Sequence, residues 1–402
     1  MTKTNHFWFF QFVIRLIGIL VFLLLFVYPI ISGWLISSGK MPLGVTRHFW
    51  MIELAQTYLL RLLGALWIFF LGSCFASFLN VVAWRVPRGR TINGSSHCPD
   101  CDQRLSFRDN TPILGWLRNN GHCSNCGLPI PTRYLIVEFI LGFVFLGIGT
   151  IELALGGINL PFRTIEKIAG LEQLIAAPQW DLIQLTSYHL TLICLLFTLA
   201  LIKSENLKVP YSVWITGLIF GTLIPLVWPN VSLINWNWST EVLSADRFSI
   251  DQYATLGIGL VAGAILGFIV NGFDRRFVPE HPYVFQKTFI SEAVASLSLV
   301  GLFLGWQSAL SIGLAAMGVS IILTLFTPRA IWSSLSTAVF ASTLFHLVAW
   351  RQLTQSGVWP SAQASVLVTL LAILSFTILA WLKAKLERIE IPESTNEIQT
   401  EA

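Results

Sequence analysis

Four cysteines form the most distinctive chemical pattern in the sequence. They lie in two Cys-x2-Cys pairs, Cys98 with Cys101 and Cys123 with Cys126, and 21 residues separate the pairs. This spacing is close to that of four-thiolate zinc sites, in which two short knuckles close a tetrahedron around one ion. Gly127 follows the second pair, where a glycine can adopt the positive φ that helps such a turn. The pattern predicts a structural Zn²⁺ held by four thiolates, with no coordination position left open for chemistry.

Other interpretations of this loop stay open. His97 and His122 each precede the first cysteine of a pair and could replace a thiolate, although four thiolates already satisfy zinc. A pair of disulfides would require the loop to face an oxidising compartment, and a metal-free loop is the third alternative. The loop has few apolar residues, so a bound ion would explain how it folds without a core of its own. Cys74 and Cys194 lie in apolar stretches and are expected to be packing residues.

The elements that carry these residues are membrane helices. Hydrophobic residues make up 54% of the 402 residues and charged residues only 11%, whereas a soluble domain has about 25% charged residues. About ten apolar stretches are long enough, or nearly so, to cross the hydrocarbon core as helices. The first is expected to be a retained span because the SGWLISSGK that ends it has no signal-peptide cleavage site. The expected spans are 16–36, 62–84, 134–156, 186–202, 210–228, 253–273, 290–306, 308–326, 332–350 and 364–382.

Basic residues set the expected orientation of these spans. With the N-terminus in the cytoplasm, 17 Lys and Arg residues fall in the cytoplasmic loops and 7 in the opposite loops. Both termini and the loop at 85–133 are therefore expected to be cytoplasmic. The sequence contains no glycine-rich phosphate loop and no basic stripe interleaved with aromatic residues, so nucleotide and nucleic-acid functions have no support. The predicted fold class is an all-α polytopic membrane protein with a cytoplasmic tetracysteine zinc-binding loop.

The residues around the cysteines resemble the N-terminal region of type IV prepilin peptidases. In that family, a span ending in a Gly-Ser-Phe-Leu-Asn segment leads into a cytoplasmic tetracysteine loop, and an Arg-Tyr-x-x-Val-Glu segment begins the next span. The resemblance covers about residues 72–140, and motif order, spacing and expected topology all agree. The matching segments are GSCFASFLNVVAWRVPRGR, HCPDCDQRLSFRDNTPILGWL and HCSNCGLPIPTRYLIVEF.

The resemblance implies a bifunctional enzyme of the bacterial inner membrane. Such enzymes cut the basic leader from prepilin-like membrane proteins in type IV pilus and type II secretion pathways, and then methylate the new N-terminal amine with S-adenosylmethionine. Asn80, Arg85 and Glu138 match family residues and are candidates for binding that cofactor. Asn80 and Arg85 could equally cap and anchor their helix, and Glu138 could be a glutamate paired with Arg133 near the membrane interface.

Leader cleavage in that family uses two aspartates, and neither is found in register. Alignment on Pro210 places Lys203 at the first aspartate position, with Glu205 two residues later. Alignment on GLFLGW, at 301–306, places Ala293 at the second position, directly after Glu292. Glu205 and Glu292 are the candidate catalytic acids if displaced carboxylates replace the pair. Otherwise the stretch ALIKSENLKVPY is a solvated turn that carries the expected cytoplasmic lysines.

Three hypotheses follow from this comparison. The first is a prepilin-peptidase-like protein whose leader peptidase activity is lost or altered, and which keeps substrate binding, zinc and the capacity for methylation. The second is an active peptidase that uses Glu205 and Glu292. The third is a non-catalytic membrane component of a pilus or secretion assembly. In all three, prepilin-like proteins and membrane lipid are the expected partners.

The expected organisation follows the spans. The divisions are an anchor span with its connection (1–61), the peptidase-like N-terminal region (62–156), a degenerate catalytic bundle (157–327), extra C-terminal spans (328–386) and a disordered cytoplasmic tail (387–402).

Two polar groups outside the motifs are expected to be structural. His189 and His346 are expected to form hydrogen bonds within the bundle, and Asp274, Arg275 and Arg276 form an interfacial cluster.

Overall fold

The computed structural model describes residues 47–98, 100–161, 163, 170–171, 178–231, 250–277, 289–326, 334–357, 359–360 and 364–389. Within these residues the chain is mostly helical, as expected. The expected first span at 16–36 and nearly all of the C-terminal tail lie outside the described residues.

Eight long helices form the described part of the protein. Six of them contain segments long and apolar enough to cross a membrane. Helix α8 (Tyr211–Val227) is shorter, and α11 (Leu335–Gln355), which covers most of the expected span at 332–350, is not among the six. An apolar run in lipid must satisfy its own backbone hydrogen bonds, which explains why these stretches are helices. The protein is therefore a multi-pass membrane protein. The helices are α3 (Arg47–Arg85), α5 (Thr132–Gly149), α7 (Trp180–Ser204), α8 (Tyr211–Val227), α9 (Ile250–Phe277), α10 (Glu292–Phe326), α11 (Leu335–Gln355) and α12 (Val366–Ile389).

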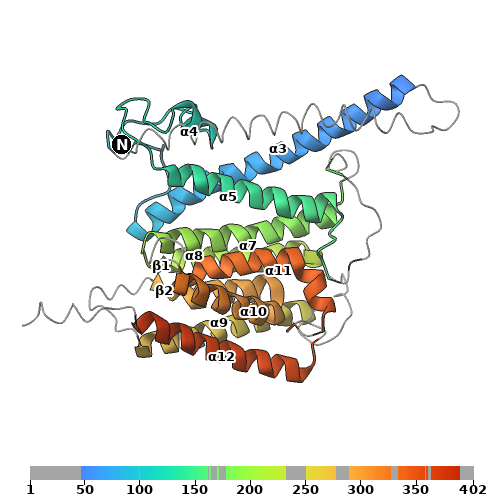
Figure 1. The fold of residues 1–402 in the computed structure, drawn as a ribbon, viewed down its shortest axis with the longest axis vertical. Coiled ribbons are helices and arrows are strands. Elements are labelled where there is room, and N and C mark those ends of the chain that lie inside the picture. The colour runs from blue at the N-terminus through green and yellow to red at the C-terminus, as the bar shows by residue number, and fades with distance from the viewer. Residues whose placement is uncertain are drawn as a thin grey trace, which may run out of the picture.

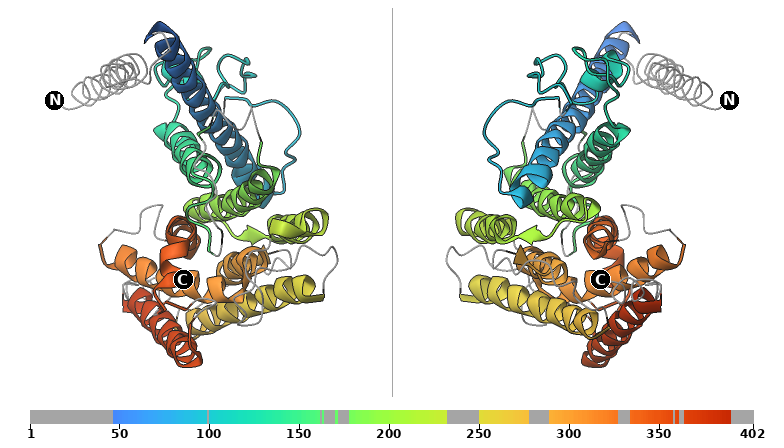
Figure 2. Two further views of the ribbon diagram at one scale, coloured as in Figure 1. Left: turned by 90° about the vertical axis from the view of Figure 1, so that its right-hand side faces the viewer. Right: turned by 90° about the vertical axis from the view of Figure 1, so that its left-hand side faces the viewer.

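Short elements connect some of these helices. The loop between α3 and α5 contains the 3-10 helix η2 (Val86–Arg88) and the short helix α4 (Leu114–Arg118). The π-helix η3 (Thr150–Ala154) continues α5, and the 3-10 helix η4 (Pro229–Val231) follows α8. Helices α3 and α5 pack as a pair above the layers formed by the other long helices (Figures 1 and 2).

Helix α10 consists of two halves, as the two expected spans at 290–306 and 308–326 suggested. Gly305 interrupts it with φ 83° and ψ 165°. A Cβ added to Gly313 would lie 3.5 Å from Cδ2 of Leu297. These two residues would be about 24 Å apart in a straight helix. The second half therefore folds back along the first, and the left-handed φ at Gly305 explains why a glycine is needed there.

Glycines allow α9 and the first half of α10 to approach at backbone distance. Gly259, Gly263 and Gly267 recur every four residues and so lie on one face of α9. A Cβ at Gly263 would overlap the carbonyl oxygen of Leu297, and a Cβ at Gly259 would overlap that of Gly301. Small residues at this spacing are a common way for membrane helices to pack closely without a hydrophobic driving force.

A two-stranded sheet joins the ends of α7 and α10. Strand β1 (Val209–Pro210) pairs antiparallel with β2 (Phe289–Ile290), in a register that places Val209 opposite Ile290. Helix α7 ends in a tight cap, in which Asn206 has φ 55° and its N–H donates to the carbonyl of Lys203 at 2.9 Å. The cap and the sheet bring residues near position 203 next to residues near position 292, which are far apart in sequence.

We expect Gly263→Ala to destabilise the protein because its methyl group would meet the Leu297 backbone, and overpacking of this kind costs about 1–3 kcal/mol. Gly257→Ala is the matched control, because a Cβ at Gly257 on the same helix meets nothing within 4 Å. The measurement is the thermal melting midpoint of each purified variant in detergent. Equal midpoints for the two variants would contradict the close approach of α9 and α10.

Candidate functional site

The four cysteines meet in the loop between α3 and α5. All four are free thiols, and their sulfur atoms lie within 4.8 Å of one another. The Sγ atoms of Cys98 and Cys126 are 3.9 Å apart. Two sulfurs on a tetrahedral zinc, each about 2.3 Å from the ion, would be about 3.8 Å apart. The cluster can therefore hold a metal ion.

Each pair of cysteines is placed by the same local turn. The N–H of Cys98 donates to the carbonyl of Gln103, and the N–H of Cys123 donates to that of Leu128. The residue after each pair has a left-handed backbone, with φ 53° at Asp102 and 72° at Gly127. The two knuckles are thus nearly equivalent in backbone, which confirms the expected role of Gly127.

The electrostatics of the cluster favour a cation among the four sulfurs. Hydrogen bonds from the backbone N–H groups of Cys126 and Asn125 lower the pKa of Cys123 to about 7. Although the backbone N–H of Leu128 favours the Cys126 thiolate, desolvation and the neighbouring thiols raise the pKa of Cys126 to about 12. Four thiolates at this distance therefore need a positive charge between them. His97 and His122 do not belong to the cluster, and Nδ1 of His122 instead lies 2.8 Å from the Asn120 carbonyl.

Asp109 links separate parts of the loop through hydrogen bonds to its carboxylate. Its carboxylate accepts hydrogen bonds from Ser106 Oγ at 2.7 Å, Asn119 Nδ2 at 2.7 Å and Ser124 Oγ at 3.1 Å. The bonds from Ser106 and Asn119 lower the pKa of Asp109 to about 2, so it stays ionised at neutral pH. Ser124 lies between the cysteines of the second pair, so the second knuckle is attached to the central part of the loop.

Glu138 connects the loop to the membrane helices. Its Oε2 accepts the backbone N–H of Ile113 at 2.6 Å, and both residues are buried. Ile113 has φ 61° and ψ −55°, a γ-turn conformation that a β-branched residue rarely adopts. A buried carboxylate that accepts this N–H stabilises the unusual backbone. The predicted alternative partner, Arg133, contacts Glu205 instead.

Asn80 and Arg85 lie at the end of α3 with different surroundings. The Arg85 guanidinium donates to the carbonyls of Thr91, Asn93 and Ser95, and so shapes the start of the loop. Asn80 is buried, and its Nδ2 has no hydrogen-bond partner in the described part of the chain. Of the three candidate cofactor residues, Asn80 is therefore the one that retains an unused donor.

Glu205 forms ion pairs on the loop side of α7. It contacts the guanidinium of Arg133, and its Oε2 lies 3.7 Å from NH2 of Arg88. Arg133 also donates to Ser204 Oγ at 3.1 Å. Glu205 thus links the end of α7 to the start of α5 and to η2.

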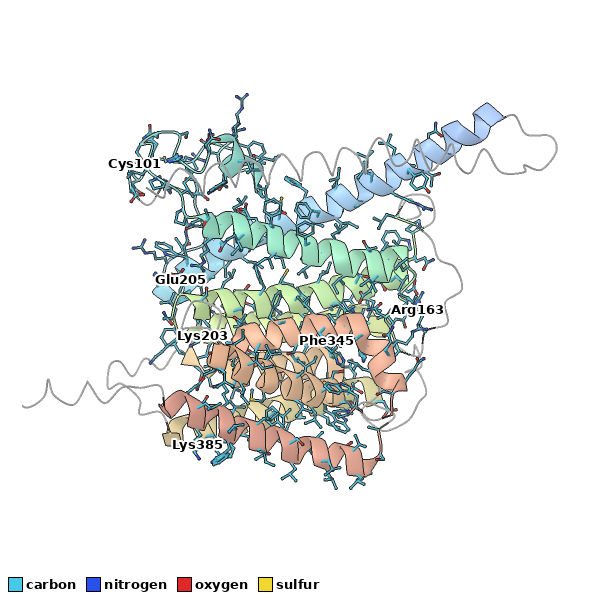
Figure 3. All side chains as sticks on the ribbon, in the orientation of Figure 1. Cys101, Arg163, Lys203, Glu205, Phe345 and Lys385 are labelled. Atoms are coloured by element: carbon cyan, nitrogen blue, oxygen red, sulfur yellow. The ribbon has the colours of Figure 1, made fainter. Side chains whose placement is uncertain are left out.

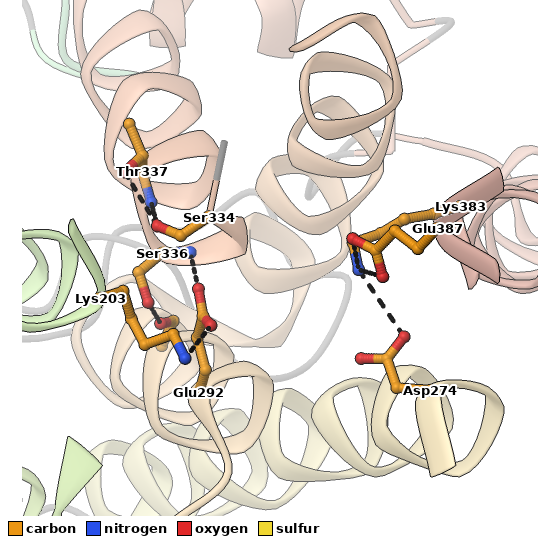
Figure 4. A network of polar contacts seen from close by, with 9 residues as sticks. Lys203, Asp274, Glu292, Ser334, Ser336, Thr337, Lys383 and Glu387 are labelled. Carbon is orange, nitrogen blue, oxygen red and sulfur yellow. Dashed lines mark hydrogen bonds and ion pairs between the residues drawn. The ribbon is translucent and has the colours of Figure 1, made fainter. Parts of the chain in front are cut away.

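Lys203 and Glu292 contact each other in a pocket of about 280 Å³. The Nζ of Lys203 lies 3.3 Å from Oε2 of Glu292, and Oε1 of Glu292 accepts the Ser336 N–H at 2.5 Å (Figure 4). Ala293 also lines this pocket and is only 3% exposed. The two positions aligned with the family aspartates therefore converge in one pocket, although neither carries an aspartate.

Three further charged residues line the pocket, and the sequence analysis assigned none of them to a functional site. Lys383 is 5% exposed, and its Nζ lies 3.6 Å from Oδ1 of Asp274 and 2.9 Å from Oε1 of Glu387 (Figure 4). Asp274 had been expected to be interfacial. The i,i+4 spacing of Lys383 and Glu387 is a sequence signal for the second ion pair. The pairing of Asp274 with a residue of α12 has no such signal.

The structure does not join Glu205 to Glu292. In the part of the chain that the structure describes, no hydrogen bond links the two carboxylates, and their cationic partners are different residues. Asp274 and Glu292 share the pocket instead, each beside its own lysine. Figure 3 shows Cys101, Glu205, Lys203 and Lys385 at the same end of the bundle, with Arg163 at the opposite end.

The fold and the site together define the class of protein: a polytopic helical membrane protein with a tetracysteine loop at one end of its bundle. Residues 70–151 match the family model described as the Bacterial Peptidase A24 N-terminal domain. The chain is 28% identical to a prepilin leader peptidase/N-methyltransferase of Myxococcus xanthus, over 66% of this chain and 65% of that protein.

Two shorter matches are to proteins of the same kind. The chain is 34% identical to a prepilin leader peptidase/N-methyltransferase of Dickeya chrysanthemi, over 25% of this chain and 46% of that protein. It is 36% identical to a type 4 prepilin-like proteins leader peptide-processing enzyme of Escherichia coli, over 19% of this chain and 35% of that protein. The chain thus spans less than two thirds of the length of each of these relatives. No solved structure matches the chain significantly. The chain is therefore similar to prepilin leader peptidases, and the family-model match covers the N-terminal region at 70–151.

We expect the purified protein to carry about one zinc ion per chain, measured by inductively coupled plasma mass spectrometry. Cys98→Ser and Cys123→Ser should lose the ion, because each removes one of four ligands. Cys194→Ser is the control and should keep it, since Cys194 lies within α7 outside the cluster. Equal zinc in all variants, or none in the wild type, would contradict the assignment.

We expect Glu138→Ala to loosen the loop from α5. It leaves the buried N–H of Ile113 without an acceptor, at a cost of about 1–3 kcal/mol. Hydrogen–deuterium exchange over residues 105–120 should therefore become faster, while the zinc content stays unchanged. Glu138→Gln keeps an acceptor oxygen and should have a smaller effect. Unchanged exchange in Glu138→Ala would show that this hydrogen bond does not hold the loop.

Proposed function

We propose that the protein is a prepilin-peptidase-like protein of the bacterial inner membrane that binds prepilin-like proteins but does not cleave their leaders. The observation that carries this proposal is the contact between Lys203 and Glu292 in the pocket where the two family aspartate positions meet. Aspartic peptidase chemistry needs two carboxylates that share one proton, so that one acts as base while the other acts as acid.

The pocket lacks that arrangement. The Lys203 ammonium group cannot accept a proton from water, and its Nζ forms an ion pair with Glu292 at 3.3 Å. Glu292 also accepts the Ser336 N–H, which fixes its position at the start of α11. Ala293 offers no group for proton transfer. The remaining residues therefore support charge pairing between helices rather than water activation.

The tetracysteine loop and the pocket are proposed to face the cytoplasm. Most of the Lys and Arg residues fall in loops on their side of the bundle, as expected for cytoplasmic loops. Zn²⁺ at the cysteines would hold the loop in shape and leave no open coordination position. The apolar side chains Leu367, Leu370 and Leu374 on α12 are exposed and suit contact with lipid.

Methyl transfer remains part of the proposal for the N-terminal region. S-adenosylmethionine, when bound, would supply the methyl group for an N-terminal amine. Asn80 has the unused, buried amide donor that suits a ligand contact. Arg85 and Glu138 would act indirectly, because their polar atoms already organise the loop through Ser95 and Ile113.

An active peptidase with displaced carboxylates is the second candidate function. The observation in its favour is that Asp274 and Glu292 line one pocket. Glu205, the other predicted acid, is paired with Arg88 and Arg133. The proposal of an active peptidase therefore depends on Asp274 and Glu292 rather than on Glu205.

Incubation of membranes containing the full chain with a prepilin, followed by mass spectrometry, tests these proposals. We expect the leader to remain attached, because each carboxylate that lines the pocket is paired with a lysine. A pilin that has already been cut and gains a methyl group would support retained transferase activity, and no methylation would favour a binding component. An active family peptidase is the positive control. A shortened pilin whose formation is abolished by Glu292→Gln, but not by Glu205→Gln, would support the displaced pair instead.

A further inference from the structure

A buried polar cluster lies at the end of the bundle opposite the cysteine loop. It begins in the π-helix η3, a wide turn that is often found at functional sites. Glu152 in η3 is 0% exposed. Its Oε1 lies 2.8 Å from Nδ1 of His189 on α7 and accepts Asn159 Nδ2 at 3.1 Å. This confirms the expected hydrogen bonding for His189.

His346 on α11 belongs to the same cluster. The ring of Trp350 lies 5.8 Å from that of His189 and 5.4 Å from that of His346, measured between ring centroids. Asn159 Nδ2 also donates to the Leu347 carbonyl at 2.9 Å, which attaches the segment after η3 to α11. Three elements, η3, α7 and α11, therefore meet around Glu152.

Several polar atoms of the cluster have no partner among the described residues. They are Oε2 of Glu152, Oδ1 of Asn159 and both ring nitrogens of His346, which is 3% exposed. The prediction that His346 forms a hydrogen bond within the bundle is therefore wrong for the described chain. Thr186 and Ser342 lie one turn before His189 and His346, and their hydroxyls are also unpartnered. Buried polar atoms of this kind require a partner, which apolar packing cannot supply.

No fixed positive charge compensates Glu152 within the described residues. Arg163 pairs with Asp181 at 2.8 Å, and Arg351 donates to the carbonyls of Leu160 and Arg163. Helix α10 also packs on α7 and α11, but its acidic residue, Glu292, lies at the opposite end of the bundle. Among the described residues, the basic group in contact with this carboxylate is the His189 imidazole.

We propose that Glu152, His189 and His346 form a proton-binding site inside the membrane. One proton lies between Glu152 Oε1 and His189 Nδ1. When the proton is on Nδ1, His189 and Glu152 form an ion pair. When the proton is on Oε1, both side chains are neutral. His346 supplies two imidazole nitrogens without a partner among the described residues, and water is the expected partner of these atoms and of Glu152 Oε2. Intramembrane acids and histidines typically mark such sites. A metal ion fits less well, because these donor atoms do not converge as the cysteine sulfurs do.

Infrared difference spectroscopy of the full chain in nanodiscs tests the proposal. The protein is titrated between about pH 5 and pH 8, the range in which histidines ordinarily change charge. We expect a band from a protonated carboxylic acid that changes with pH, is absent in Glu152→Gln and is shifted along the pH axis in His346→Gln. Asp181→Asn, which removes an exposed carboxylate on the same side, should leave the band unchanged.

Three results would overturn the proposal. The first is a carboxyl band that persists in Glu152→Gln, or no band at any pH in a folded wild-type protein. The second is an unchanged titration in His346→Gln, which would remove that residue from the site. The third is a bound metal ion that survives Cys98→Ser and is lost in His346→Gln. Circular dichroism and gel filtration of each variant establish that it is folded, and His189→Gln provides a second variant if Glu152→Gln does not fold.

Discussion

The close approach of α9 and the first half of α10 is the contact on which the pocket depends. Gly259, Gly263 and Gly267 bring the α9 backbone against that of α10, where a methyl group would already overlap a carbonyl oxygen. This contact fixes where Glu292, at the start of α10, lies along the helix axes relative to Asp274 near the end of α9. The β1–β2 pairing then brings the end of α7 to the same place. Without these backbone contacts, five charged side chains from four helices could not surround one cavity.

The charges in that pocket explain why it can lie next to the membrane. Each lysine has a carboxylate partner, with Lys203 beside Glu292 and Lys383 beside Asp274 and Glu387. A charge that is taken out of water is tolerated when it is paired and hydrogen-bonded. Lys383 is almost completely buried, so its two acidic partners are the groups that keep its charge compensated. The proposed loss of leader cleavage rests on the same pairing, because each carboxylate that lines the pocket has a lysine as its partner.

Local sequence patterns predicted the parts of the structure that depend on short-range geometry. The turn within each Cys-x2-Cys pair, the turn at Gly127 and the break in α10 near Gly305 are each set within a few residues, and the structure has all three. The long-range partners were not predictable in this way. Glu138 was considered as a partner of Arg133, but it holds the Ile113 backbone across 25 residues of chain. Asp274 was expected at the interface, and its pairing with Lys383 depends on how α12 packs against α9, which no local pattern encodes.

The residues that resemble the family most closely have structural partners in this chain. Arg85 shapes the start of the loop, Glu138 holds an unusual turn, and Gly115 within the Asp109–Trp116 segment packs against the Asp109 carbonyl. Each of these contacts stabilises the loop whether or not the protein cleaves a substrate. Selection for the folded loop alone would therefore be sufficient to retain the motif, whichever residues stand at 203 and 293. For this reason the similarity of the N-terminal region supports shared architecture more strongly than shared chemistry, and the pocket residues decide the activity.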